Sequence, residues 1–246
     1  CYICKKLFSA NPKEKKVRDH NHFTGQYRGA AHSSCNLKLR NTSKLNVFFH
    51  NGKNFDFHLL VEKLGVIIYN NEPLNIDVIP ENKEKFKILS INSNLTFKDS
   101  LQVLTSSLDR LASYITSFKY INLIKNLTPN ASEEDIDLLK KKGVYPYEYI
   151  RGYETFKEQQ LPPKEAFYSK LRDEGISDED YERAKTVWST FNCKDLGEYH
   201  FIYLFTDVFL LADVFETFRD TALLEYKLDP AHFISSPGFS SNALLH

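Results

Sequence analysis

The sequence contains no methionine, one tryptophan and only four cysteines in 246 residues. No hydrophobic run approaches the length of a bilayer span and no secretory signal pattern is present, so we expect neither a membrane partner nor secretion. Three cysteines fall within the first 35 residues and Cys193 stands alone. This spacing does not suit a disulfide framework and predicts a reducing compartment. Because a cysteine stands first and methionine is missing, we expect a piece of a longer protein.

The composition is that of a globular protein, with 42% hydrophobic and 26% charged residues. The net charge of zero hides an asymmetry. Residues 1–44 carry ten Lys and Arg against Glu14 and Asp19, a net charge of +8, so residues 45–246 carry −8. The basic segment predicts a phosphate-bearing partner, with a solvated lysine-rich loop as the alternative. We therefore divide the chain into a small module, 1–44, and a larger region, 45–246.

Two pairs of metal-binding residues share the same short spacing near the N-terminus. Cys1 and Cys4 are separated by two residues, and so are His32 and Cys35. Tetrahedral Zn²⁺ is commonly held by two such pairs of sulfur and nitrogen donors. The repeated gap makes chance proximity the weaker alternative, so the spacing predicts a structural Zn²⁺ site made of these four residues.

A second cluster lies between the two pairs. It consists of Asp19, His20, Asn21 and His22, followed by Thr24-Gly25 and Arg28-Gly29, and Asn36 comes directly after the last zinc pair. The whole pattern resembles the recombination endonuclease VII group of zinc-containing HNH (ββα-metal) nucleases over residues 1–40. This resemblance implies a small zinc-bound ββα module.

The same resemblance implies roles for individual residues. Asp19 and Asn36 would hold Mg²⁺, and His20 would act as the general base that deprotonates the attacking water. His22 and Arg28 would contact DNA.

The region 45–246 predicts an α/β structure from its hydrophobic periodicity. The expected strands are 45–49, 66–69, 77–79, 86–90 and 94–97. The expected helices are 56–64, 107–117, 136–141 (preceded by a cap and first-turn acids at 132–135 and ended by Gly143), 177–188 and 195–224.

Polar residues at two places in this region form a further pattern. Asn51 is followed by Phe55 and Asp56 at a strand-to-helix junction, and Tyr203 precedes Asp207 by one helical turn. Each pattern alone is common. In this order, they resemble the second and third exonuclease motifs of family B DNA polymerases.

Such 3′–5′ proofreading sites use carboxylates to hold two divalent ions. The resemblance implies that Asp56 and Asp207 bind Mg²⁺ or Mn²⁺ and that Tyr203 orients the attacking water. Asn51 and Phe55 would contact the frayed primer end.

Two further motifs resemble those of protein-primed polymerases. Ser100-Leu101 begins a Ser-Leu-x2-hydrophobic motif, which implies contacts to single-stranded DNA and to a terminal primer protein. Lys142 fits the lysine motif near the third exonuclease element, and Lys141 fits it equally well.

The wider sequence resembles the Polinton/Maverick-type polymerases, in several of which an endonuclease VII-like zinc insert interrupts the exonuclease region. The segments that carry this likeness include 97–101, 142–149, 161–163 and 236–239. The resemblance implies an RNase H-like exonuclease fold, a mixed sheet with flanking helices, within a DNA polymerase that acts in the nucleus, at a viral or mobile-element replication site, or in a mitochondrion. No Asp-x-Glu, the first exonuclease motif, precedes Asn51.

Two other functions stay open. His32 stands where the endonuclease VII group usually has Cys, and Asn21 where a second Asp is frequent. The chain is then either an active HNH endonuclease acting on branched DNA or a DNA-binding remnant without catalysis.

Overall fold

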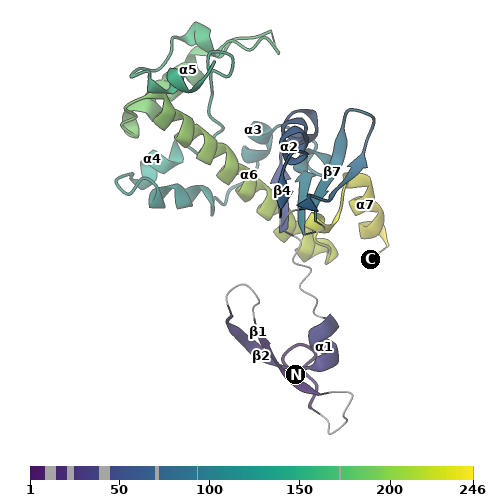
Figure 1. Ribbon diagram of the computed structural model, residues 1–246. Helices are drawn as coiled ribbons and strands as arrows, with labels where there is room; N and C mark the ends of the chain where they lie inside the picture. The colour runs from purple at the N-terminus through teal and green to yellow at the C-terminus, as the bar shows by residue number, and fades with distance from the viewer. Residues whose placement is uncertain are drawn as a thin grey trace.

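The computed structural model describes residues 1–8, 15–20, 25–38, 45–69, 72–92, 94–171 and 173–245. Three groups of elements follow one another along the chain: a small N-terminal module, a mixed β-sheet and a helical region (Figure 1). The strands are β1 Lys16–His20, β2 Tyr27–His32, β3 Leu45–Phe49, β4 Ile68–Tyr69, β5 Glu72–Pro73, β6 Ile76–Pro80, β7 Phe86–Ile91 and β8 Leu95–Asp99. The α-helices are α1 Ser33–Lys38, α2 Asp56–Leu64, α3 Leu108–Ala112, α4 Glu133–Asp137, α5 Asp178–Thr190, α6 Leu196–Tyr226 and α7 Ser236–Leu244. Short 3₁₀ helices are η2 Gly52–Asn54, η3 Ser100–Gln102, η4 Ile121–Asn126, η5 Tyr153–Lys157, η6 Lys164–Phe167 and η7 Pro230–His232.

The N-terminal module has the order ββα. Strands β1 and β2 pair antiparallel, and α1 follows β2 and contacts both strands. Side chains alternate between the two faces of a strand. Asp19 and Ala31 are buried, whereas Lys16, Arg18 and His20 are exposed. The hairpin therefore has one covered face and one exposed face.

The main sheet has the strand order β3-β8-β7-β6. Strand β3 pairs parallel with β8, and the β8–β7 and β7–β6 pairs are antiparallel. Because parallel strands end at the same edge of a sheet, the residues that follow Phe49 and Asp99 lie side by side. This edge positions the candidate site.

Helices pack on both faces of the sheet. Phe49 of β3 packs against Phe57 of α2, with ring centroids 5.7 Å apart. The preceding residue, Phe48, packs instead against Phe215 of α6 at 4.2 Å. Since adjacent strand residues point to opposite faces, α2 and α6 lie on opposite sides of β3.

The long helix α6 links the sheet to the helical region (Figure 1). Its residues between Leu196 and Val214 join residues of α3, η4, α4 and α5 in one hydrophobic core. Asp195 caps its N-terminus through a 2.9 Å hydrogen bond from the Glu198 amide, and Lys227 ends it with a φ of 58°. None of the helices in the described part of the chain combines the length and hydropathy that a membrane span requires.

The expected strand 45–49 and helix 56–64 are confirmed residue for residue. The expected cap at Ser132 and the expected first-turn acids at 133–135 are confirmed, because α4 begins at Glu133 and Ser132 forms a capping box with Asp135. The expected end at Lys141 is wrong, because α4 ends at Asp137. Gly143 does not end a helix; it lies against Tyr203, whose Cδ2 would be 3.1 Å from a Cβ at this position.

Candidate functional site

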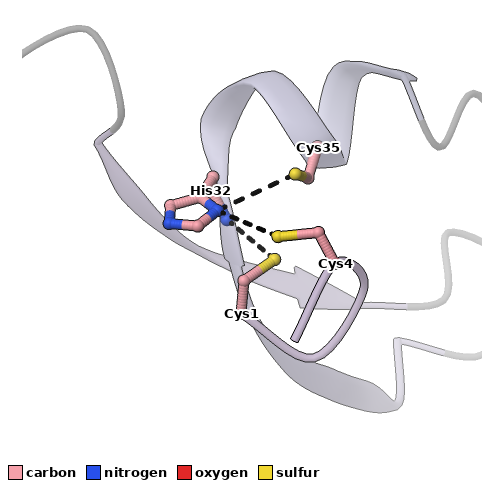
Figure 2. A group of neighbouring side chains, drawn as sticks. All are labelled: Cys1, Cys4, His32 and Cys35. Atoms are coloured by element: carbon pink, nitrogen blue, oxygen red, sulfur yellow. Dashed lines mark hydrogen bonds between the residues drawn. The ribbon is translucent and has the colours of Figure 1, made fainter. Parts of the chain in front are cut away.

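The four predicted zinc ligands converge in the N-terminal module (Figure 2). The ligand atoms of Cys1, Cys4, His32 and Cys35 all lie within 4.8 Å of one another. Sulfur atoms around tetrahedral Zn²⁺, each bonded at about 2.3 Å, lie about 3.8 Å apart. The donor set therefore fits Zn²⁺, and the ligand atoms would need to move only slightly closer together.

Hydrogen bonds orient the histidine of this cluster. Its Nε2 lies 3.1 Å from the carbonyl oxygen of Leu7, whereas its Nδ1 lies 3.5 Å from the Cys4 sulfur. A carbonyl oxygen accepts only from a protonated nitrogen, so Nε2 carries the hydrogen and Nδ1 keeps its lone pair for a metal. The backbone amide of Lys6 lowers the pKa of the Cys4 thiol, and Cys35 acts in the same direction, which favours the thiolate that binds metal.

The residues of the predicted HNH site differ in their burial and contacts. Asp19 is buried at the end of β1, where the Tyr2 hydroxyl donates to its carboxylate and Arg28 lies 3.9 Å away. The neighbouring His20 is exposed, and Asn36 is half-buried on α1. His22 lies outside the described residues.

The loop after β3 is organised by Asp99, the last residue of β8. The Asp99 carboxylate accepts hydrogen bonds from the backbone amides of Asn51 (2.8 Å), Lys53 (3.2 Å) and Leu101 (3.0 Å). Asn51 adopts a left-handed φ of 70°, a conformation that asparagine tolerates better than most residues. One buried carboxylate thus fixes both segments that the sequence assigned to DNA contact.

His50 connects the same two segments. Its Nδ1 lies 3.0 Å from the Ser100 hydroxyl, and its Nε2 lies 2.8 Å from the carbonyl oxygen of Ser106. The hydroxyl of Ser100, which is fully buried, donates to the Phe49 carbonyl at 2.8 Å. Ser100 therefore fixes the loop from inside the protein, and Leu101 beside it is half-buried.

The second motif presents one exposed and one half-buried side chain. Phe55 is 51% exposed and precedes α2, and Asp56 is the first residue of that helix. Burial raises the pKa of Asp56, and the neighbouring charge of Asp99 raises it further. The side chain of Asn54 donates to Asn51 Oδ1 at 2.5 Å, which orients the Asn51 side chain.

The third motif forms a hydrogen-bonded cluster on α6. Asp207 Oδ2 accepts from the Tyr203 hydroxyl and from Lys142 Nζ, each at 3.1 Å. The Tyr147 hydroxyl lies 2.5 Å from that of Tyr203. Burial raises the pKa of Tyr203, as does the charge of Asp207, so the hydroxyl stays protonated and acts as a donor. Lys141 pairs instead with Asp180 at 3.4 Å, so Lys142 and not Lys141 contacts Asp207.

The second oxygen of Asp207, Oδ1, is buried and has no hydrogen-bond partner within the described ranges. A buried acceptor without a donor is costly unless a partner satisfies it. A divalent cation, which prefers oxygen ligands, would satisfy this oxygen.

Electrostatics connect this cluster to the loop after β3. Burial lowers the pKa of His50, Lys142 also lowers it, and Asp99 and Asp207 raise it. These charges therefore act on His50 from both β8 and α6. Within the described part of the chain, no hydrogen bond or ion pair joins Asp56 to Asp207.

Sequence reasoning missed Asp99, His50 and Tyr147, because their roles depend on contacts between distant segments.

The family described as DNA polymerase type B, organellar and viral, matches residues 36–245. The chain therefore belongs to the organellar and viral type B DNA polymerases, and DNA is the partner that this family implies. The match begins directly after Cys35, so the four candidate zinc ligands precede it. Searches of curated proteins and of solved structures gave no match.

Proposed function

We propose that residues 45–245 supply the second and third motifs of a 3′–5′ proofreading exonuclease site in a protein-primed DNA polymerase. The observation that carries this proposal is the Asp207 carboxylate. One of its oxygens is held by Tyr203 and Lys142, while the other is buried without a partner among the described residues. A carboxylate that is fixed on one side and unsatisfied on the other suits a metal ligand.

Asp207 and Asp56 would hold Mg²⁺ or Mn²⁺, which offsets the charge that develops on the attacking and leaving oxygens. Tyr203 would orient the attacking water through its hydroxyl. Its raised pKa keeps this hydroxyl protonated, so Tyr203 would not act as the base. Lys142 holds the Asp207 carboxylate in position at 3.1 Å.

The loop after β3 would receive the 3′ end of the primer. Phe55 exposes half of its surface, and an exposed aromatic ring stacks on a base irrespective of sequence. Asn51, fixed by Asp99 and Asn54, would contact the terminal nucleotide. Leu101, which is half-buried, would contact single-stranded DNA, while the buried Ser100 would hold the loop in place. The terminal primer protein remains a proposed partner on the same grounds of resemblance.

The proposal includes an RNase H-like fold, for which the parallel β3–β8 pair with helices on both faces is the supporting observation. The first exonuclease motif would come from sequence outside this chain, as would the nucleotidyl-transfer site. The same proposal includes the likeness to Polinton/Maverick-type polymerases. It also includes replication in a nucleus, in a mitochondrion, or at a viral or mobile-element site.

For the N-terminal module, we propose a structural Zn²⁺ site within an endonuclease VII-like insert. The ββα order supports an HNH-type module, with Asp19 on β1 and Asn36 on α1. However, Tyr2 and Arg28 already engage the Asp19 carboxylate, and Mg²⁺ would have to compete with both. The second candidate function is therefore an HNH endonuclease, and the third is DNA binding without cleavage.

Three assays separate these functions. In the polymerase that contains these residues, Asp56→Ala should abolish removal of a mismatched 3′ nucleotide, and unchanged removal would count against proofreading. Mg²⁺-dependent nicking of branched DNA that disappears in His20→Ala would favour the endonuclease. Binding without cleavage in any metal would favour the remnant.

A further inference from the structure

The exposed face of the β1–β2 hairpin carries a row of cations. Lys16 and Arg18 lie two residues apart on β1, so their side chains point to the same face about 7 Å apart. Both residues are exposed. Val17, which lies between them, is half-buried, and Asp19, which follows Arg18, is buried. Within the described ranges, neither Lys16 nor Arg18 forms an ion pair.

Each cation lies over an aromatic ring. Lys16 Nζ is 5.1 Å from the centroid of the Phe8 ring, and Arg18 Cζ is 5.2 Å from that of Tyr27. Tyr27 is paired with His20 across the hairpin and keeps 51% of its surface exposed. The face therefore combines positive charge with an accessible aromatic ring.

No negative charge opposes this row among the described residues of the module. Their one carboxylate, Asp19, is buried on the other face and engaged by Tyr2 and Arg28. The face is thus complementary to a polyanion rather than to a protein surface of mixed charge.

We propose that Lys16, Arg18 and Tyr27 form a binding platform for single-stranded DNA, independent of base sequence. Cations would contact successive phosphates, and Tyr27 would stack on a base; a charged groove with aromatic rings is how proteins bind single strands. Duplex DNA offers phosphates but no unstacked base, so the exposed Tyr27 ring favours the single strand. The proposal rests on the proposed function only in taking DNA as the substrate.

The test is fluorescence anisotropy of the whole chain with a labelled oligo-dT and with a matched duplex. Tyr27→Ala should weaken oligo-dT binding by about 5- to 150-fold, the range that loss of one base–aromatic stack gives. Lys16→Gln/Arg18→Gln should weaken binding and lower the slope of log K against log salt by about 1.4, because two phosphate contacts are lost.

The matched control is Lys170→Gln/Lys194→Gln, which removes the same charge at two side chains that are each 84% exposed. It should leave the affinity within about twofold of wild type. Equal weakening by both double variants, unchanged binding in Tyr27→Ala, or equal affinity for duplex and single strand would overturn the proposal. Metal content and circular dichroism confirm that each variant is folded. Removal of a mismatched 3′ nucleotide is measured separately from anisotropy, so failure of the exonuclease proposal is distinguishable from failure of this one.

Discussion

The carboxylate of Asp99 accepts a hydrogen bond from the backbone amide of Asn51 at 2.8 Å, which joins the ends of two parallel strands. Asp99 is 4% exposed and also accepts from Lys53 and Leu101. The segments that we assign to primer contact therefore share one anchor. The shape of the site depends on this residue, although Asp99 itself need not touch DNA.

Replacing this anchor should destabilise the protein. Asp99→Asn keeps one oxygen for the Asn51 and Leu101 amides, but its NH₂ group faces the Lys53 amide. The variant therefore loses one hydrogen bond to a charged acceptor, worth about 1.5–3 kcal/mol. We expect the free energy of unfolding in urea to fall by about 3 kcal/mol or less. The control is Asp109→Asn, an exposed residue on α3, which should change it by no more than about 0.5 kcal/mol. Equal effects of the two variants would show that Asp99 is not an anchor.

The zinc site makes a prediction about metal content. The purified chain should carry one Zn²⁺, and Cys35→Ser should lose it, because a structural site needs all four donors. Mass spectrometry of the metal content measures this directly. Cys193→Ser is the matched control, since Cys193 lies outside the cluster and burial raises its pKa to about 11. Loss of zinc in the control, or its retention in Cys35→Ser, would contradict the assignment.

The ionisation of Asp56 affects the stability of the folded protein. Burial raises its pKa, so the folded state holds the proton more tightly than the unfolded chain does. The resulting stability is present below the ordinary pKa of 3.8 and is lost as pH rises through the raised value. Asp56→Asn should therefore melt at a higher temperature than wild type at pH 7, and the difference should vanish near pH 3. A lower melting temperature at pH 7 would contradict the assigned cause.

Tyr203 should contribute to excision through its hydroxyl. Tyr203→Phe removes the donor to Asp207 and should slow removal of a mismatched 3′ nucleotide by about a hundredfold, with little change in KM, because a misplaced reacting group costs about that much. Tyr199→Phe is the control: it lies one turn earlier on α6 and donates to the Val144 carbonyl at 2.8 Å. If the two variants lose excision equally, the effect is structural.

The sequence predicted those features that depend on local periodicity or on short spacing. Strand β3 and helix α2 were predicted residue for residue, because five apolar-rich residues end at a His-Asn-Gly turn and helical spacing then begins. The zinc donors were predicted from two equal gaps, and the structure brings all four together. The long helix predicted at 195–224 was equally evident from its apolar spacing, and α6 spans Leu196–Tyr226.

What the sequence did not predict depends on distant contacts. Asp99 reaches Asn51 across 48 residues, and Tyr147 reaches Tyr203 across 56. No spacing rule connects such residues. The choice between Lys141 and Lys142 likewise required the structure, because only the side-chain directions distinguish the two neighbours. The end of α4 at Asp137, four residues before the predicted end at Lys141, was likewise not evident from the apolar pattern.

The central claim is that Asp207 is a metal ligand of an exonuclease site. The most direct measurement is the rate at which the polymerase containing these residues removes a mismatched 3′ nucleotide, compared between wild type, Asp207→Ala and Asp220→Ala, an exposed residue on the same helix. We predict that Asp207→Ala loses excision by more than about a hundredfold while primer extension persists, and that Asp220→Ala retains both activities. Excision at the wild-type rate in Asp207→Ala would contradict the account.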